Sequence, residues 1–352
     1  MGTIKSIRVL VALAAMPVSI AASATTPRAQ AGCATCHKEQ AQSHPTTSMS
    51  NALTPVSSAG ILQKHPALKF SSPPFTYTIV REDDRSIYSV TDGKQTLSAP
   101  ISWAFGLGAA GQTYVYELNG SFYESRVSFF ETLQGLDITM GANKSVPKNI
   151  EEALGRRMDN KDRFECFSCH ATGGMQNLKI DFDQMVPGIQ CTNCHKQAEQ
   201  HLSAIRAGDA MKAMAIPRLS KLSTEETSDF CGRCHRTWAD IATNGPRDVN
   251  NVRFPPYRLT NSKCYDATDK RISCVACHDP HRPSEREAKA YDAKCQACHS
   301  PGSDSAAAKK ICHTAKSECV TCHMPKFEIP GSHHQFMDHM IRIARQNEAY
   351  PY

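Results

Sequence analysis

The sequence predicts a mainly α protein of short helices and loops, with a small antiparallel β region inserted near its N-terminus. Six copies of the pattern Cys-x-x-Cys-His crowd residues 166–323 and leave few apolar side chains for an ordinary core. Helix-capping signals occur at Asn149 and in Ser223-Thr224-Glu225-Glu226. Aromatic and β-branched runs lie within residues 75–130, which contain no Cys.

The repeated pattern is the attachment motif for c-type haem, and a seventh copy stands near the start of the chain. A zinc site or a disulfide framework would not require a His directly after every second Cys. We therefore expect seven covalently bound haem c groups, with each Cys pair forming thioethers and the next His binding the iron. The macrocycles would then form the core around which the short helices and loops pack. The predicted attachment and proximal residues are Cys33, Cys36 and His37; Cys166, Cys169 and His170; Cys191, Cys194 and His195; Cys231, Cys234 and His235; Cys274, Cys277 and His278; Cys295, Cys298 and His299; and Cys319, Cys322 and His323.

The remaining eight His are candidates for the second axial position, which predicts mostly bis-His haems of low reduction potential. His201 and His281 follow a proximal His too closely to reach the opposite face of the same haem, so we expect each to serve a neighbouring haem. His333 and His334 are adjacent and are not both expected to bind iron. His65 and His313 stay open as candidates, and Met49 and Met337 are possible replacements. The predicted distal ligands are His44, His201, His281, His333 and His339.

The chain divides into four predicted segments. Residues 1–24 read as a signal peptide, because Lys5 and Arg8 precede an apolar run that ends in Ala22-Ser23-Ala24. The alternative of a membrane anchor is disfavoured by the short length of that run. Residues 25–74 hold the first haem motif and a linker, residues 75–145 form the β-rich region without haem, and residues 146–352 form the hexahaem cluster. A C-terminal ligand helix is expected over residues 336–344.

In the β region, Asp92-Gly93 and Asn119-Gly120 predict hairpin turns. A two-residue turn at Asn119-Gly120 would place Tyr116 opposite Tyr123. Residues 106–111 match Gly-x-Gly-x-x-Gly, but the residues that follow read as a strand. A dinucleotide site needs a helix there, so a flexible loop is the better interpretation.

Two Cys, Cys264 and Cys312, lie outside the motifs. In an exported protein we expect a disulfide between them. The alternative is an eighth haem attached by one thioether at Cys312-His313.

The formal net charge of +6 does not indicate nucleic-acid binding. The basic residues form no run, and each haem adds two propionates that they would offset. With its signal peptide removed, the protein is expected in the periplasm or at the cell surface, without a membrane span.

With these residues assembled, the chain resembles the cytochrome c552/c554 family of multihaem cytochromes. The likeness rests on Pro187-Gly188-Ile189-Gln190 before Cys191, on Asp279-Pro280-His281 after His278, and on Met324-Pro325-Lys326 after His323. It implies electron transfer with redox partner proteins, such as quinol-oxidising or terminal oxidoreductases. Related proteins also include nitrite, hydroxylamine and tetrathionate enzymes, so the resemblance leaves catalysis open. The Cys-x-x-Cys-Lys site of many pentahaem nitrite reductases is absent from the sequence.

Two functions follow as hypotheses. The first is an electron-transfer protein with a chain of mostly bis-His haems. The alternative is a multihaem oxidoreductase that converts a small nitrogen or sulfur compound at one open-face haem. His37 is the predicted centre for that reaction, because its motif is isolated and lies beside the β region.

Overall fold

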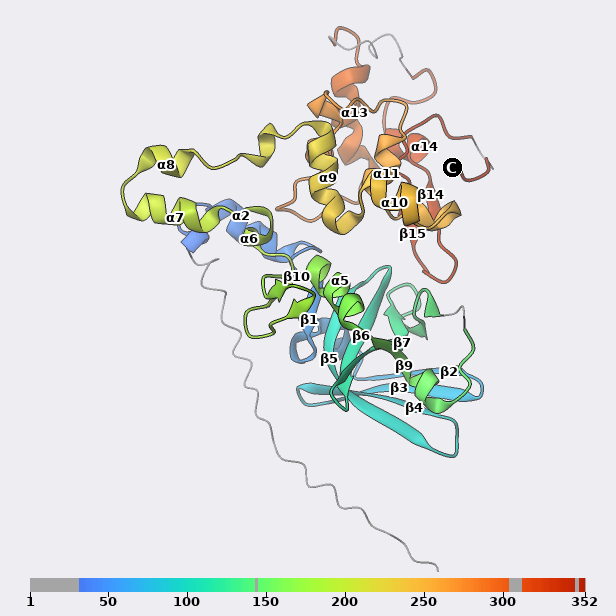
Figure 1. Ribbon diagram of the computed structural model, residues 1–352. Helices are drawn as coiled ribbons and strands as arrows, with labels where there is room; N and C mark the ends of the chain where they lie inside the picture. The colour runs from blue at the N-terminus through green and yellow to red at the C-terminus, as the bar shows by residue number, and fades with distance from the viewer. Residues whose placement is uncertain (1–31, 143–144, 304–311, 346–347, 352) are drawn as a thin grey trace, which may run out of the picture.

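The computed structural model describes residues 32–142, 145–303, 312–345 and 348–351. The predicted signal peptide, residues 1–24, lies outside the described residues. The chain forms two parts, a curled β sheet and a group of short helices, which are stacked one on the other (Figure 1). No helix in the described ranges has the length and apolar character needed to cross a membrane.

The strands are, in chain order, β1 (Leu53–Pro55), β2 (Ala67–Ser72), β3 (Phe75–Glu82), β4 (Arg85–Thr91), β5 (Thr96–Gly108), β6 (Gly111–Leu118), β7 (Ser121–Phe130), β8 (Gly135–Ile138), β9 (Gly155–Met158), β10 (Ala171–Thr172), β11 (Met175–Gln176), β12 (Lys179–Ile180), β13 (Val186–Pro187), β14 (Lys326–Glu328) and β15 (Gln335–Met337).

The α-helices are α2 (Lys38–Ser43), α3 (Gly60–Lys64), α4 (Ile150–Leu154), α5 (Asn160–His170), α6 (Cys191–Cys194), α7 (Ala198–Arg206), α8 (Ala210–Met214), α9 (Thr224–His235), α10 (Trp238–Asn244), α11 (Pro255–Thr260), α12 (Cys274–Cys277), α13 (Asp292–His299) and α14 (Cys319–His323). Short 3-10 helices are η1 (His44–Thr46), η2 (Val56–Ser58), η4 (Leu219–Lys221), η5 (Asp248–Asn251), η6 (Lys270–Ile272) and η7 (Ala288–Tyr291).

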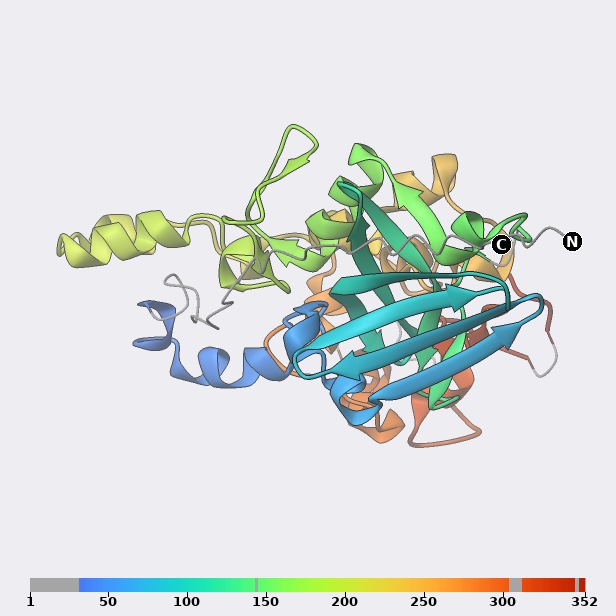
Figure 2. The same ribbon diagram turned by 90° about the horizontal axis from the view of Figure 1, so that it is seen from below.

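The main sheet has nine antiparallel strands in the order β2-β3-β4-β5-β6-β7-β8, with β1 added to β5 and β9 added to β7. Its outer strands β2 and β8 contact each other, so the sheet curls into a nearly closed barrel, whose strands β2–β4 face the viewer in Figure 2. The prediction of a mainly α fold with a small β region is therefore wrong. The sheet is the largest single element of the protein, and its strands lie between Leu53 and Met158.

The sequence predicted too few strand residues, because segments at the edges of the sheet become strands through pairing with a neighbour more than through local propensity. Ala67–Ser72 lies in a segment that read as a linker, yet it pairs along its whole length with Phe75–Glu82 across a turn at Pro73-Pro74. Gly155–Met158 has no β-branched residue and becomes a strand because it pairs with β7. The glycine-rich segment is the turn between β5 and β6, where Gly108 pairs with Gly111, so a tight turn replaces the predicted flexible loop.

The local predictions at Asn119-Gly120, Asn149 and Ser223 are confirmed, whereas at Asp92-Gly93 only Gly93 has a positive φ, so the predicted turn type is not formed there. Tyr116 pairs with Tyr123 across the Asn119-Gly120 turn, and their rings stack with centroids 5.7 Å apart. The Asn149 side chain accepts a hydrogen bond from the backbone N–H of Glu152, and Ser223 forms a capping box with Glu226.

The C-terminal helix predicted over residues 336–344 is not formed. Gln335–Met337 instead pairs with Lys326–Glu328 as a hairpin. The next residue, Asp338, is held by the buried guanidinium of Arg258 through two hydrogen bonds of 2.8 and 2.9 Å. This long-range ion pair overrides the local helical pattern.

The two parts differ in how much apolar surface they bury. The sheet encloses a large core that includes Tyr77, Tyr88, Tyr114 and Phe129, and helix α4 packs against it. Beyond residue 190, the buried hydrophobic residues in the described part are few and mostly small: Ala204, Ala213, Ile241, Val252, Val320 and Ile329. Side chains alone do not build a core in the helical part.

Candidate haem-binding cavity

Each Cys-x-x-Cys-His motif forms about one helical turn. In the motifs that begin at Cys33, Cys191 and Cys274, the backbone N–H of the His donates to the carbonyl of the first Cys at 2.9 Å. This turn places both thiols and the imidazole on one face, because residues three and four apart lie above one another on a helix. The longer helices α5, α9 and α13 end in a motif His.

One cavity of about 4100 Å³ is lined by residues from all seven motifs. Ordinary ligand pockets measure about 300–1,000 Å³, so this space is large enough for several macrocycles. Every predicted attachment Cys lines it except Cys166. Cys166 packs instead against a small core around Phe167, and burial raises the pKa of its thiol to about 12.

Three pairs of His face each other across this cavity. Their ring centroids are 6.4 Å apart for His37 and His201, 6.2 Å for His195 and His281, and 6.2 Å for His278 and His339. Two metal–nitrogen bonds of about 2 Å, with about 1 Å from each nitrogen to its ring centre, give about 6 Å between two imidazoles on one metal ion. The spacing of all three pairs would let both imidazoles of a pair bind one iron.

Several of these rings are oriented by a hydrogen bond on Nδ1. Its acceptor is the carbonyl of Ala52 for His170, of Ala213 for His201, of Arg342 for His323 and of Met337 for His339, at 2.9–3.1 Å. A carbonyl oxygen only accepts, so Nδ1 must carry the proton and Nε2 keeps its lone pair. This is the tautomer and the support that a metal-binding imidazole needs.

Burial also keeps these imidazoles neutral. It lowers the pKa of His170, His195, His235 and His278, and it lowers the pKa of His339 to about 4. Neighbouring imidazoles lower it further, as His281 and His37 do for His195. An imidazole must be deprotonated on one nitrogen to bind iron, so this environment suits ligation.

Four of the five predicted distal ligands line the cavity, namely His44, His201, His281 and His339. The fifth, His333, lies outside the cavity lining, and its Nε2 is 2.8 Å from a carboxylate oxygen of Asp137. Its neighbour His334 lines the cavity, as does His313. His65 does not line it, and its ring packs on Phe129. The sequence had no signal that could choose between His333 and His334.

Thiols of different motifs contact one another. Side-chain interactions that shift the thiol pKa values join Cys33 to Cys191, Cys169 to Cys234, Cys231 to Cys274, and Cys295 to Cys319. Weaker electrostatic interactions link Cys194 to Cys231 and Cys277 to Cys295. The seven attachment sites are therefore connected in one series, which runs through the motifs of His37, His195, His235, His278, His299 and His323. The motif of His170 branches from that of His235.

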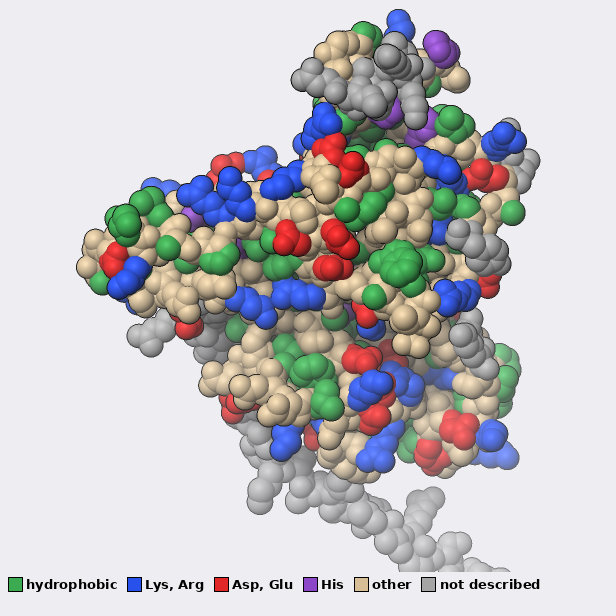
Figure 3. Space-filling view, turned by 45° about the horizontal axis from the view of Figure 1, so that its top comes forward, with side chains coloured by type: hydrophobic (Ala, Val, Ile, Leu, Met, Phe, Trp, Pro, Cys, Tyr) green, Lys and Arg blue, Asp and Glu red, His purple; other side chains and the backbone are tan. Residues whose placement is uncertain are grey.

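The cavity lining carries more Lys and Arg than Asp and Glu. Figure 3 shows clusters of Lys and Arg on the surface of the same part, separated by patches of Asp and Glu. An excess of cations around the cavity suits a ligand with ionised carboxylates, such as the two propionates of a haem.

Cys264 and Cys312 are both free thiols in the structure, so the expected disulfide is not formed. Both line the cavity. Burial raises the pKa of the Cys264 thiol, and interactions with Cys298 and Cys277 add to the effect.

The comparison with known families agrees with this geometry. The model of the family described as cytochrome c554 and c-prime matches residues 138–196, which include the motifs of His170 and His195. Over these residues the chain is similar to that family, which supports a c-type cytochrome. The similarity supports haem c as a covalently bound cofactor and suggests a function with redox partners. No curated protein and no solved structure matches the cytochrome significantly.

Proposed function

We propose that this cytochrome carries seven haem c groups in its large cavity and transfers electrons between redox partner proteins outside the cytoplasm. The observation that carries the proposal is the series of side-chain interactions that links the attachment sites, some through neighbouring thiols and two through electrostatic interactions alone. For example, the thiol of Cys33 interacts with that of Cys191, and the thiol of Cys231 interacts with that of Cys274. Cofactors attached at neighbouring sites would lie side by side, where electrons could pass from one to the next.

The residues around the cavity support this role. Each haem, when bound, supplies an iron that gains or loses one electron. The His pairs supply two nitrogen ligands, which favours low potentials. The surrounding Lys and Arg offset the propionates. The signal-peptide pattern of residues 1–24 supports an exported location, where redox partners such as quinol-oxidising or terminal oxidoreductases would be met.

The experiment that tests the proposal combines intact mass with a redox titration of the mature protein. We expect a mass that corresponds to seven haems and an uptake of seven electrons per molecule. An eighth haem would instead support attachment at Cys312. A protein with fewer than seven haems, or with haems that exchange no electrons with the others, would contradict the proposal.

A second candidate function is a multihaem oxidoreductase with one open-face haem. Of the eight His outside the motifs, only six line the cavity, because His65 and His333 do not. Six distal His cannot serve seven haems, so at least one iron would have no distal His. The small nitrogen or sulfur compound of the alternative hypothesis would bind there, unless Met49 or Met337 in the cavity lining occupies the position.

The open face would not be at His37, because His201 faces His37 across the cavity. Low-temperature electron paramagnetic resonance of the ferric protein separates the two functions. A high-spin signal from about one haem in seven would favour the oxidoreductase, and small oxyanions should then be screened as substrates. Low-spin signals alone would mean two strong ligands at every iron and would favour the carrier.

A further inference from the structure

The adjacent residues His333 and His334 have different surroundings. His333 contacts the sheet: its Nε2 is 2.8 Å from Oδ2 of Asp137, and its ring packs edge-on against Phe130 with centroids 4.8 Å apart. Its carbonyl accepts a hydrogen bond of 2.8 Å from the Thr132 hydroxyl. The three partners lie at the end of β7, in the turn that follows it and in β8, so His333 fastens the hairpin β14–β15 to the sheet.

The ring of His334 lies in the cavity lining near Glu131, Arg286 and Lys326. It packs edge-on against Phe336 with centroids 4.7 Å apart. Among the described residues, no protein group forms a hydrogen bond with either of its ring nitrogens. The imidazole therefore has both nitrogens available on the side where the motif residues gather.

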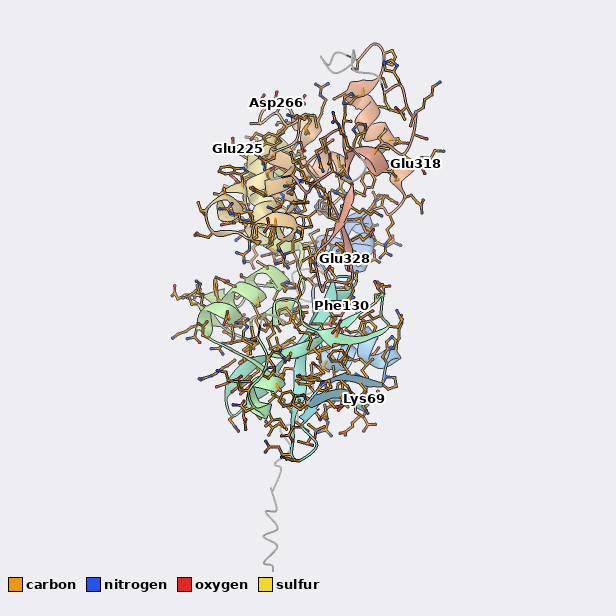
Figure 4. The ribbon with its side chains drawn as sticks, turned by 90° about the vertical axis from the view of Figure 1, so that its right-hand side faces the viewer. Lys69, Phe130, Glu225, Asp266, Glu318 and Glu328 are labelled. Atoms are coloured by element: carbon orange, nitrogen blue, oxygen red, sulfur yellow. The ribbon has the colours of Figure 1, made fainter. Side chains whose placement is uncertain are left out.

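The backbone of the hairpin tip separates the two rings. His333 has a φ of +49°, in the left-handed region, and Gly331 two residues earlier has a φ of +79°. The buried Ser332 hydroxyl donates to the carbonyl of His334 at 3.1 Å and accepts from its N–H at 3.3 Å. Figure 4 shows Phe130 at the end of the sheet that faces the hairpin bearing Glu328. The tip is thus held between the two parts in a defined conformation.

We propose that His334, in place of His333, is an axial iron ligand, and that His333 positions it by tying the hairpin to the sheet. The inference rests on the proposed haem-binding function. It gives the sheet a definite role toward the cofactors, since Asp137, Phe130 and Thr132 hold the residue beside the ligand.

A His that binds a metal often donates its other nitrogen to a carboxylate, so the Asp137 contact alone would also fit His333 as a ligand. Two observations argue against that role. His333 is absent from the cavity lining, and its ring is covered by Phe130. An axial ligand needs direct access to the cavity, and His334 has that access whereas His333 does not.

The test compares His334→Ala with His333→Asn in the mature holoprotein, after intact mass has shown the same number of haems in both. Asn is chosen because it tolerates the left-handed backbone of position 333. We expect His334→Ala to convert one haem from low-spin to high-spin, and added imidazole to restore the low-spin signal.

For His333→Asn we expect the resting spectrum to stay low-spin while cyanide binds one haem faster than in the wild type, because the hairpin that carries the ligand opens locally more often. Asp137→Asn should give the same acceleration. An unchanged spin state in His334→Ala, or a full conversion in His333→Asn, would overturn the inference. A chain that carries no haem would instead overturn the proposed function itself.

Discussion

The curled sheet and the helical part are stabilised by different means. The sheet buries large aromatic side chains such as Tyr88, Tyr114 and Phe129 in a continuous core. The helical part surrounds a cavity of about 4100 Å³ lined by thiols and imidazoles. Burial of apolar side chains is the main source of folding free energy. The sheet can therefore be stabilised by its own core, whereas we expect the helical part to need its cofactors.

A dependence on bound cofactors would explain how helices as short as these can be stable in the helical part. Helices such as α6, α12 and α14 have four or five residues, which is too few for stability in isolation. Covalent attachment would fix each of them to a rigid macrocycle, and an axial His would then tie in a distant segment. The following predictions test this contrast, from the largest expected effect to the smallest.

The largest effect should follow from preventing haem attachment by replacing the Cys of all seven motifs. We expect residues 190–303 and 312–345 to lose their structure, whereas the sheet between residues 53 and 158 stays folded on its own core. Hydrogen exchange followed by mass spectrometry measures the two parts separately. Equal protection of both parts in the haem-free chain would contradict the comparison.

A large effect is also expected from Asp338→Asn in the holoprotein. The side chains of Arg258 and Asp338 are both 0% exposed, and the substitution leaves a buried guanidinium without its carboxylate. Such a loss costs about 3–5 kcal/mol in the free energy of unfolding. Chemical denaturation measures it, and Asp269→Asn is the control, because its pair with Arg271 is partly exposed and worth about 1 kcal/mol or less. Similar decreases in the free energy of unfolding of the two variants would show that the buried pair stabilises the protein no more than the exposed pair.

Alanine substitutions at two glycines with the same backbone conformation separate the cost of backbone strain from the cost of a steric clash. Gly120 at a hairpin turn has a φ of +72°, and Gly188 before the motif of Cys191 has a φ of +73°. Alanine at Gly120 meets nothing within 4 Å and should cost about 1–2 kcal/mol from the left-handed backbone alone. At Gly188 the added Cβ would collide with the backbone carbonyl of Ser50, so we expect a loss of about 3 kcal/mol or more. Equal effects on the denaturation midpoint would mean that the contact with Ser50 is easily relieved.

The smallest effect concerns the pH dependence of stability near the last motif. The backbone N–H groups of Cys319 and Glu318 donate to the Asp292 carboxylate and lower its pKa. A depressed carboxyl pKa stabilises the fold above the unfolded value of about 3.9, and this contribution disappears as the pH falls below it. Asp292→Asn should therefore be slightly less stable than the wild type at pH 6, with the difference shrinking as the pH is lowered below 4. A difference that is independent of pH would contradict the assignment.

Local signals in the sequence predicted the features that depend on neighbouring residues. The register of Tyr116 with Tyr123 and the caps at Asn149 and Ser223 were correct because a turn or a cap involves only a few successive residues. The extent of the sheet was underestimated because β2 and β9 become strands through their partners. The C-terminal helix was wrong because Arg258, far away in sequence, holds Asp338 in an extended segment.

The sequence by itself determined the chemistry of this cytochrome. Two thiols and an imidazole at fixed spacing form one face of a helical turn wherever they occur, so the haem motifs could be recognised without any fold. The tertiary structure decided which imidazoles meet, because His37 and His201, or His278 and His339, come together only when distant segments pack. It also decided between His333 and His334, since a left-handed residue and a carboxylate on the sheet direct adjacent rings to different places.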